Sequence, residues 1–239
     1  MKSQLLASVH WNGSKRPVLL IFDVNETLID YESLNPLFAR LFGDKRVMRE
    51  WLGYLEMYSM TLKLSGYYKD YWTLGGGIFQ MVGAIHGINI TEEHVEALKE
   101  GMKTMPAHLD AEEGLKRLRD AGYRMVTLNN SPAIKNRKSP LESAGLSKYF
   151  ERQFNMESSC AYKPCSIVYH MVADAMNLAP EQCCMVTTHV WDAIGAQSAG
   201  LSSGLITRRG NAPLLIPGLP HPNIIAKDIL TFSGGMAGL

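Results

Sequence analysis

Short apolar runs recur along the chain and are separated by stretches with helical periodicity. Five of them read as strands, at residues 18–22, 124–128, 183–187, 203–207 and 224–226. The first is continuously apolar, as expected of a central strand in a parallel sheet, because such a strand is covered on both faces. The pattern therefore predicts a sheet whose strands are mostly buried.

Helical patterns lie between several of these strands, at residues 112–121, 166–176 and 192–199. Gly122 and Gly200 follow two of the helices, and glycine is a frequent stop signal at such a position. Strands that alternate with helices predict an α/β fold with a doubly wound, parallel, Rossmann-like sheet.

One long segment, residues 31–106, interrupts this alternation because it contains helical patterns and no clear buried strand. Apolar positions share one face over residues 34–42 and another over residues 51–62, and further helices are predicted near 71–86 and 92–105. We interpret the segment as a helical cap inserted after the first strand. The expected domains are an α/β core of residues 1–30 and 107–239, and a cap of residues 31–106.

Composition narrows the range of partners and compartments. The 239 residues are 46% hydrophobic, enough for one sizeable core with a smaller insert. A net charge of +1 indicates neither a nucleic-acid partner nor an anionic membrane. No apolar run approaches the roughly 20 residues that span a bilayer. The four cysteines lack disulfide or zinc-type spacing, so we expect reduced thiols and a cytoplasmic location.

Polar side chains follow the expected strands at their carboxyl ends, where open parallel sheets bind their ligands. They are Asp23, Asn25 and Thr27 after the first strand, Asn129 and Asn130 after the second, and Thr187, His189 and Asp192 after the third. A Tyr-Lys-Pro segment containing Lys163 precedes the third strand. A single Asp at a strand end can simply cap a helix, but the ordered set favours a catalytic site.

This order of segments resembles the four motifs of the haloacid dehalogenase superfamily. The matching segments are FDVNETLID at residues 22–30, LNNSP at 128–132, YKP at 162–164 and VTTHVWDAIGA at 186–196. Within the superfamily, Trp191, Asp192, Tyr169 and the RRGN segment at 208–211 are similar to type II L-2-haloacid dehalogenases. The resemblance covers the chain from about Val18 to its end, and matches the cap only loosely.

The resemblance implies a role for each of four catalytic candidates. Asp23 would attack the substrate and form a covalent ester or acyl phosphate, which water then hydrolyses. Lys163 would keep Asp23 ionised through its opposite charge. Thr27 would hydrogen-bond beside the nucleophile, and Asp192 would orient or activate the water.

Asn25 favours dehalogenation over the hydrolysis of phosphate esters. Phosphatases of the superfamily carry an Asp at this position, which protonates the leaving alcohol; Asn cannot ionise, and halide leaves without a proton. The position four before Asp192 holds Thr188 instead of a further carboxylate for Mg²⁺. We therefore expect no required metal or other cofactor, with Mg²⁺ only if the chain is a phosphatase.

The remaining candidates are assigned to substrate binding. They are Asn25, Asn129, Asn130, Tyr169, Thr187, His189, Trp191, Arg49 and Trp51. Asn129 replaces the usual Ser or Thr, and its amide can still donate to a carboxylate. His189 replaces the usual Asn, and would either donate a hydrogen bond or add a titratable group beside the ester.

The cap departs most from the pattern of the type II enzymes, which carry an Arg on an early cap helix. Arg49 is about two helix positions away. Three explanations stay open: Arg49 substitutes, ring edges and amides hold the halide, or the leaving group is not halide. Trp51 and Trp191 would line an apolar pocket, although packing in the core is an equal alternative for Trp51.

We therefore expect a hydrolase that displaces halide from a small 2-haloalkanoic acid and yields a 2-hydroxy acid. One alternative keeps the Asp23 nucleophile and changes the leaving group to a C–N or phosphate group. Another is a catalytically idle relative that serves as a binding module. The expected partner is a small carboxylate, without nucleic acid or membrane, and the apolar cap helices would suit a homodimer interface.

Overall fold

The computed structural model describes residues 10–131, 138–155 and 161–238. Its sheet has six parallel strands in the order β3-β2-β1-β4-β5-β6. The strands are β1 (Leu19–Phe22), β2 (Arg124–Asn129), β3 (Arg152–Asn155), β4 (Cys183–Thr187), β5 (Ser202–Ile206) and β6 (Ile224–Ala226). β1 lies at the centre, where Leu19 is level with Arg124 of β2 and Cys183 of β4. Pro132, the last residue of the second motif, and Cys160 lie outside the described residues.

The structure confirms the predicted parallel α/β sheet and adds one strand. Each of the five expected strands is present within one residue of its predicted bounds. β3 was missed because its sequence, RQFN, is largely polar, and its first two residues are exposed. It pairs with β2 at the edge of the sheet, where no continuous apolar run is required.

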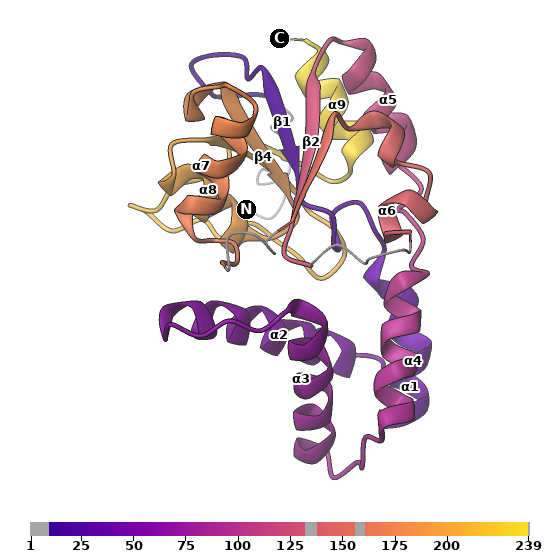
Figure 1. The fold of residues 1–239 in the computed structure, drawn as a ribbon. Helices are drawn as coiled ribbons and strands as arrows, with labels where there is room; N and C mark the ends of the chain where they lie inside the picture. The colour runs from indigo at the N-terminus through magenta and orange to yellow at the C-terminus, as the bar shows by residue number, and fades with distance from the viewer. Residues whose placement is uncertain (1–9, 132–137, 156–160, 239) are drawn as a thin grey trace.

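Helices cover both faces of the sheet, with α7 and α8 on one side and α5 and α9 on the other (Figure 1). They are α5 (Ala111–Asp120), α7 (Ser166–Ala175), α8 (Val190–Ser198) and α9 (Ile229–Ala237), with shorter helices α6 (Pro140–Ser143), η2 (Ser147–Tyr149) and η3 (Pro180–Gln182). Alternate residues of β1 enter the two cores: Leu20 and Phe22 join the core with Ile229 of α9, and Leu19 and Ile21 join the core with Tyr169 of α7.

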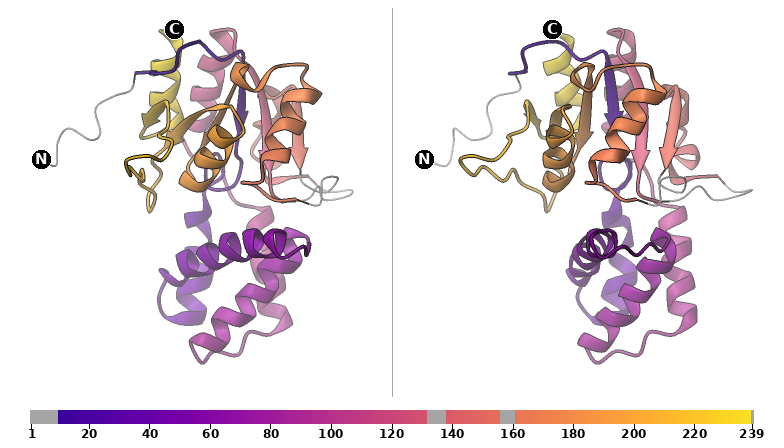
Figure 2. Two further views of the ribbon diagram at one scale, coloured as in Figure 1. Left: turned by 90° about the vertical axis from the view of Figure 1, so that its left-hand side faces the viewer. Right: turned by 60° about the vertical axis from the view of Figure 1, so that its left-hand side comes forward.

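A helical cap follows β1 and lies beyond one end of the sheet in all the ribbon views (Figure 2). It consists of η1 (Tyr31–Leu34), α1 (Asn35–Phe42), α2 (Val47–Leu64), α3 (Tyr71–Ile85) and α4 (Glu92–Lys103). Phe38 packs against Trp51 and Phe79, with ring centroids 5.8 and 5.3 Å apart. The inserted cap that the sequence predicted is thus confirmed, while domain limits at 30/31 and 106/107 remain our proposal.

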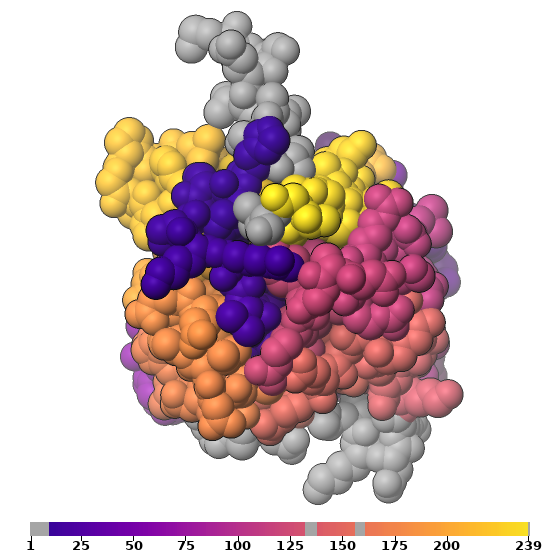
Figure 3. Space-filling model, turned by 90° about the horizontal axis from the view of Figure 1, so that it is seen from above, coloured from indigo at the N-terminus to yellow at the C-terminus, as the bar shows by residue number. Residues whose placement is uncertain are grey.

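The opposite end of the sheet is crossed by the N-terminal segment, which Figure 3 shows in indigo beside the yellow C-terminal helix. The Arg16 guanidinium lies 4.3 Å from the centre of the Tyr123 ring and donates to the carbonyl of Ala121 at 2.8 Å. Among the helices described, none is both long enough and apolar enough to cross a membrane.

Candidate active site

A tight turn directly after β1 presents Asp23. The Asp23 amide donates to the carbonyl of Val186 at 2.9 Å, so the nucleophile candidate still belongs to the parallel ladder. Glu26 adopts a left-handed backbone with φ of 63°, and Leu28 closes the turn by donating to Val24 at 3.0 Å. This turn brings the side chain of Thr27 back to Asp23.

Thr27 joins the β1 turn to the end of β4. Its hydroxyl donates to Oδ2 of Asp23 at 2.6 Å and accepts a hydrogen bond from the Thr188 amide at 2.9 Å. The hydroxyl is therefore satisfied in both directions, and its donation orients one carboxylate oxygen of Asp23.

Lys163 lies between two carboxylates. Its Nζ is 2.7 Å from Oδ1 of Asp23 and 2.8 Å from Oδ2 of Asp192, and its side chain is 1% exposed. The backbone at Lys163 is held beside the end of β2, because the Lys163 amide donates to Oδ1 of Asn130 at 2.9 Å. Burial alone would raise the pKa of Asp23, but Lys163 and His189 outweigh it and hold that pKa well below its usual range.

Asp192 lies behind the nucleophile and has no exposed side-chain surface. Its Oδ1 accepts a hydrogen bond from the Tyr169 hydroxyl at 2.6 Å, and its Oδ2 contacts Lys163. Both carboxylate oxygens are thus engaged by donors, and Asp192 positions the Lys163 ammonium group. Its predicted role toward water stays a prediction.

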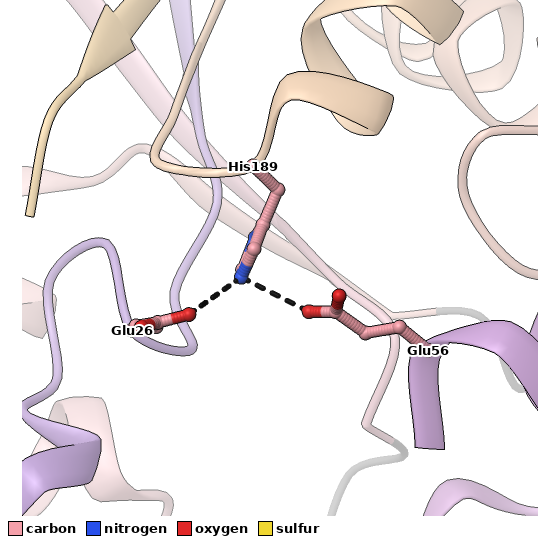
Figure 4. Close-up of side chains that lie close together, drawn as sticks. All are labelled: Glu26, Glu56 and His189. Carbon is pink, nitrogen blue, oxygen red and sulfur yellow. Dashed lines mark hydrogen bonds and ion pairs between the residues drawn. The ribbon is translucent and has the colours of Figure 1, made fainter. Parts of the chain in front are cut away.

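His189 connects Asp23 to two glutamates. Its Nε2 lies 3.0 Å from Oε2 of Glu26 and 3.1 Å from Oε1 of Glu56 (Figure 4). Its Nδ1 lies 3.3 Å from Oδ2 of Asp23. The imidazole stacks on Trp191, with ring centroids 5.0 Å apart, and the indole N–H of Trp191 donates to Glu56 at 3.0 Å.

Opposing effects set the pKa of each group in this cluster. Burial lowers the pKa of His189, but the carboxylates of Glu56 and Asp23 outweigh burial and raise it above its usual value. Burial also raises the pKa of Glu56, only partly countered by His189 and Trp191. The imidazolium form is therefore favoured while Asp23 is ionised.

Arg49 binds Glu26 instead of facing the cavity. Its guanidinium contacts Glu26 and also reaches Oε1 of Glu32 at 2.8 Å and the carbonyl of Arg209 at 2.7 Å. Asn211 donates to the same oxygen of Glu26 at 2.9 Å. The expectation that Arg49 contacts substrate is not supported by this placement, because the guanidinium compensates a buried carboxylate.

A small cavity opens above Asp23. It is lined by Asp23, Asn25, Glu26, Tyr31, Leu52, Glu56, Tyr71, Asn129, Asn130, His189 and Trp191. Six of the sequence-predicted residues are in this lining: Asp23, Asn25, Asn129, Asn130, His189 and Trp191. An adjoining cavity shares Asn25, Tyr31 and Asn129 with it.

The other predicted residues lie around the cavity and do not line it. Tyr169 bonds to Asp192, and the Thr187 hydroxyl accepts a hydrogen bond from the His189 amide at 3.1 Å. Trp51 is fully buried in the cap, where its indole donates to the carbonyl of Gly75 at 3.0 Å. We therefore remove Tyr169, Thr187 and Trp51 from the substrate-contacting set, since each side chain supports the packing or a neighbour.

Five lining residues were missed by sequence reasoning: Glu26, Tyr31, Leu52, Glu56 and Tyr71. Glu26 lies inside the first motif, three residues after Asp23, so its acidic side chain could have been recognised as a candidate site residue. Glu56 follows Leu52 by four positions and so shares its helix face, but nothing local indicates that this face meets Asp23. The Tyr31 hydroxyl is buried and has no hydrogen-bond partner within the part of the chain that the structure describes.

Glu26, Glu56 and His189 form the group in the described residues whose ligand atoms, all within 4.8 Å, could hold a cation. Arg49 and Asn211 already bond to the other oxygen of Glu26, and Trp191 bonds to Glu56. The distances of 3.0 and 3.1 Å from Nε2 of His189 to Glu26 and Glu56 also fit an imidazole N–H that lies between two carboxylates without a cation. At Asp23 and Asp192, the ammonium group of Lys163 supplies the positive charge.

Comparison with known proteins agrees with this geometry. The model of the haloacid dehalogenase-like hydrolases matches residues 18–200. The chain is 26% identical to (S)-2-haloacid dehalogenase 4A of Burkholderia cepacia over 195 residues, covering 81% of this chain and 84% of the relative. It is 25% identical to (S)-2-haloacid dehalogenase 1 of Pseudomonas sp. (strain CBS-3), covering 79% and 83%.

A solved structure with covalently bound chloropropionic acid has a similar fold. It is that of L-2-haloacid dehalogenase from Xanthobacter autotrophicus, with a TM-score of 0.82 and 18% identity, covering 93% of this chain and 99% of that one. At this identity the likeness concerns the fold alone.

Proposed function

The chain belongs to the haloacid dehalogenase-like hydrolases, and on that premise we propose that it displaces halide from a small 2-haloalkanoic acid through an ester on Asp23. The observation that carries this proposal is the state of Asp23. Its carboxylate is held ionised by Lys163 at 2.7 Å, is oriented by Thr27 at 2.6 Å, and faces the cavity. An ionised, oriented carboxylate is a competent nucleophile.

The reaction has two steps. An oxygen of Asp23 attacks the α-carbon, and the carbon–halogen bond breaks with its electron pair leaving on the halide. Water then attacks Cγ of the ester, so that the product oxygen leaves as the hydroxyl of a 2-hydroxy acid and Asp23 returns as a carboxylate. Over both steps one halide and one proton are released for each water consumed.

Asn25 supports halide over phosphate as the leaving group. It lines the cavity, donates to the Ser131 hydroxyl at 3.2 Å, and has no proton to give to a leaving alcohol. A phosphate ester or C–N substrate would need that proton from another group. The proposed reaction requires no cofactor, because the nucleophile and its countercharge both belong to the chain.

Donors in the cavity take the place of the cap arginine. The amides of Asn129 and Asn130 and the buried hydroxyl of Tyr31 face the space above Asp23. Burial raises the pKa of Tyr31, so its hydroxyl keeps its proton and can donate to a carboxylate or a departing halide.

The test is halide release from L-2-chloropropionate. We expect turnover by the wild type, none by Asp23→Asn, and unchanged turnover by Asp44→Asn, a control at an exposed carboxylate. In H₂¹⁸O, repeated turnover should place ¹⁸O in the peptide that contains Asp23. A correctly folded wild type that releases no halide would contradict the proposal, and an adduct from a phosphate ester or a C–N substrate would support the alternatives.

A further inference from the structure

We propose that His189 is the general base that activates water for hydrolysis of the Asp23 ester, and that Glu26 and Glu56 position its imidazole ring. This inference rests on the proposed function, because it requires an ester on Asp23. It assigns a catalytic role to a side chain that replaces the Asn expected from the sequence motif.

The Nδ1 nitrogen of His189 faces the nucleophile. It lies 3.3 Å from Oδ2 of Asp23. A water that attacks Cγ of the Asp23 ester must approach from the cavity, which both side chains line. A base within hydrogen-bonding reach of that water can accept its proton.

The two glutamates select the tautomer that this role needs. Nε2 contacts Oε2 of Glu26 at 3.0 Å and Oε1 of Glu56 at 3.1 Å, from opposite sides in Figure 4. Carboxylates only accept, so in the neutral imidazole they hold the proton on Nε2 and leave the Nδ1 lone pair toward the Asp23 ester. This is the arrangement by which a carboxylate orients a catalytic histidine.

Asp192 is poorly placed for the same task. Both of its oxygens are engaged, one by Lys163 at 2.8 Å and one by Tyr169 at 2.6 Å, and it has no exposed surface. A water would have to displace one of these donors to reach it. His189 needs no such rearrangement.

Ester formation itself prepares the base. In the free enzyme the negative charge of Asp23 is one of the groups that raise the pKa of His189. Alkylation of Asp23 removes that charge, so the neutral imidazole becomes more favourable in the intermediate than in the free enzyme, and Nδ1 releases its proton to solvent. The other charged groups around the ring are Glu26, Glu56 and Lys163, and none of them changes its covalent state.

The proton inventory closes over the hydrolytic step. Water gives one proton to Nδ1 as its oxygen bonds to Cγ. The bond between Cγ and the product oxygen then breaks, and that oxygen takes the proton from Nδ1. Asp23 then passes its remaining proton to Nδ1, because Lys163 stabilises the carboxylate, and the free enzyme with its imidazolium is restored.

The test separates the two steps in a single turnover with enzyme in excess over L-2-chloropropionate. In His189→Asn and His189→Gln we expect halide release near the wild-type rate and hydrolysis slower by about 100-fold or more. The ester should then persist on the Asp23 peptide in mass spectra. Glu56→Gln should slow hydrolysis less and shift its acid limb to lower pH, because one of the charges that raise the pKa of His189 is gone.

A matched control is His86→Asn, which removes a histidine paired with Glu50 at 2.8 Å at the end of α3. It should leave both steps unchanged. Folded His189 variants that hydrolyse the ester at the wild-type rate, or that lose halide release as well, would overturn the inference. Hydrolysis that a chelator abolishes and Mn²⁺ restores would also overturn it, by making the cluster a cation site. If the wild type releases no halide, the Asp23 ester does not form, and this outcome would refute the proposed function itself.

Discussion

The ammonium group of Lys163 lies within 2.8 Å of both Asp23 and Asp192, and neither carboxylate is more than 4% exposed. One buried cation therefore compensates two buried anions. Removing one partner of a buried ion pair is costly because the remaining charge is left without compensation.

Lys163→Met should lower the free energy of unfolding by roughly 3–5 kcal/mol, measured by urea denaturation. It should also raise the pKa of Asp23, so that residual activity grows with pH. Lys163→Met combined with Asp192→Asn should recover part of the lost stability, since one anion is removed. Lys148→Met, at an exposed pair with Glu112, is the control and should change stability by less than about 1 kcal/mol.

Thr27→Val should cost about 1–3 kcal/mol, because the buried Thr188 amide loses its acceptor. It should also lower kcat, since Oδ2 of Asp23 loses the hydrogen bond that orients it. Thr27→Ser keeps the hydroxyl and should retain most of both properties. An unaffected Thr27→Val together with an impaired Thr27→Ser would show that the Thr27 methyl group matters and its hydrogen bonds do not.

Tyr31→Phe removes a buried hydroxyl that has no partner in the described residues, so stability should stay the same or rise slightly. If that hydroxyl donates to substrate, kcat/KM should fall by about 10-fold, the value of roughly 1.4 kcal/mol. Tyr162→Phe is the matched control, because Tyr162 is equally buried but does not line the cavity above Asp23. A loss of the same size in both would point to packing.

The free energy of unfolding should decrease as the pH is lowered through the window set by His108. Burial, followed by the charge of Arg208, lowers the pKa of His108 to about 4, and its ring bonds to the carbonyl of Glu26 at 3.0 Å. Between pH 6.5 and about 4 the unfolded chain therefore binds a proton that the folded chain does not. His108→Gln should flatten the urea midpoint against pH in this window; an unchanged slope would assign it to other groups.

The sequence predicted the parts of this protein that depend on local pattern. β1 is continuously apolar, so it could be recognised as a buried strand. The motifs that follow it contain Asp23, Thr27, Lys163 and Asp192, and these four side chains lie together in the structure. β3 was missed because an edge strand needs no apolar run. The catalytic roles of these residues remain predictions for the experiments above.

The cap could not be predicted to the same depth, because its contacts with the core join residues far apart in the sequence. Glu56 meets His189 only because α2 lies over the end of the sheet. The sequence position of Arg49 suggested a substrate-binding arginine, but its guanidinium forms an ion pair with Glu26. Trp51 has the spacing of an apolar helix face, and that spacing alone does not say which cavity the face lines.

The pairing of one imidazole nitrogen with two carboxylates also has an evolutionary consequence. A relative with Asn at position 189 would lose the imidazole that binds the acidic side chains at positions 26 and 56, and burying them would cost it more. Acidic residues at those positions and histidine at 189 should therefore be inherited and lost together across the family. A chain in which only one of the three residues is substituted should be less stable or less active. Glu26, Glu56 and His189 together should therefore mark a distinct lineage among the dehalogenase-like chains.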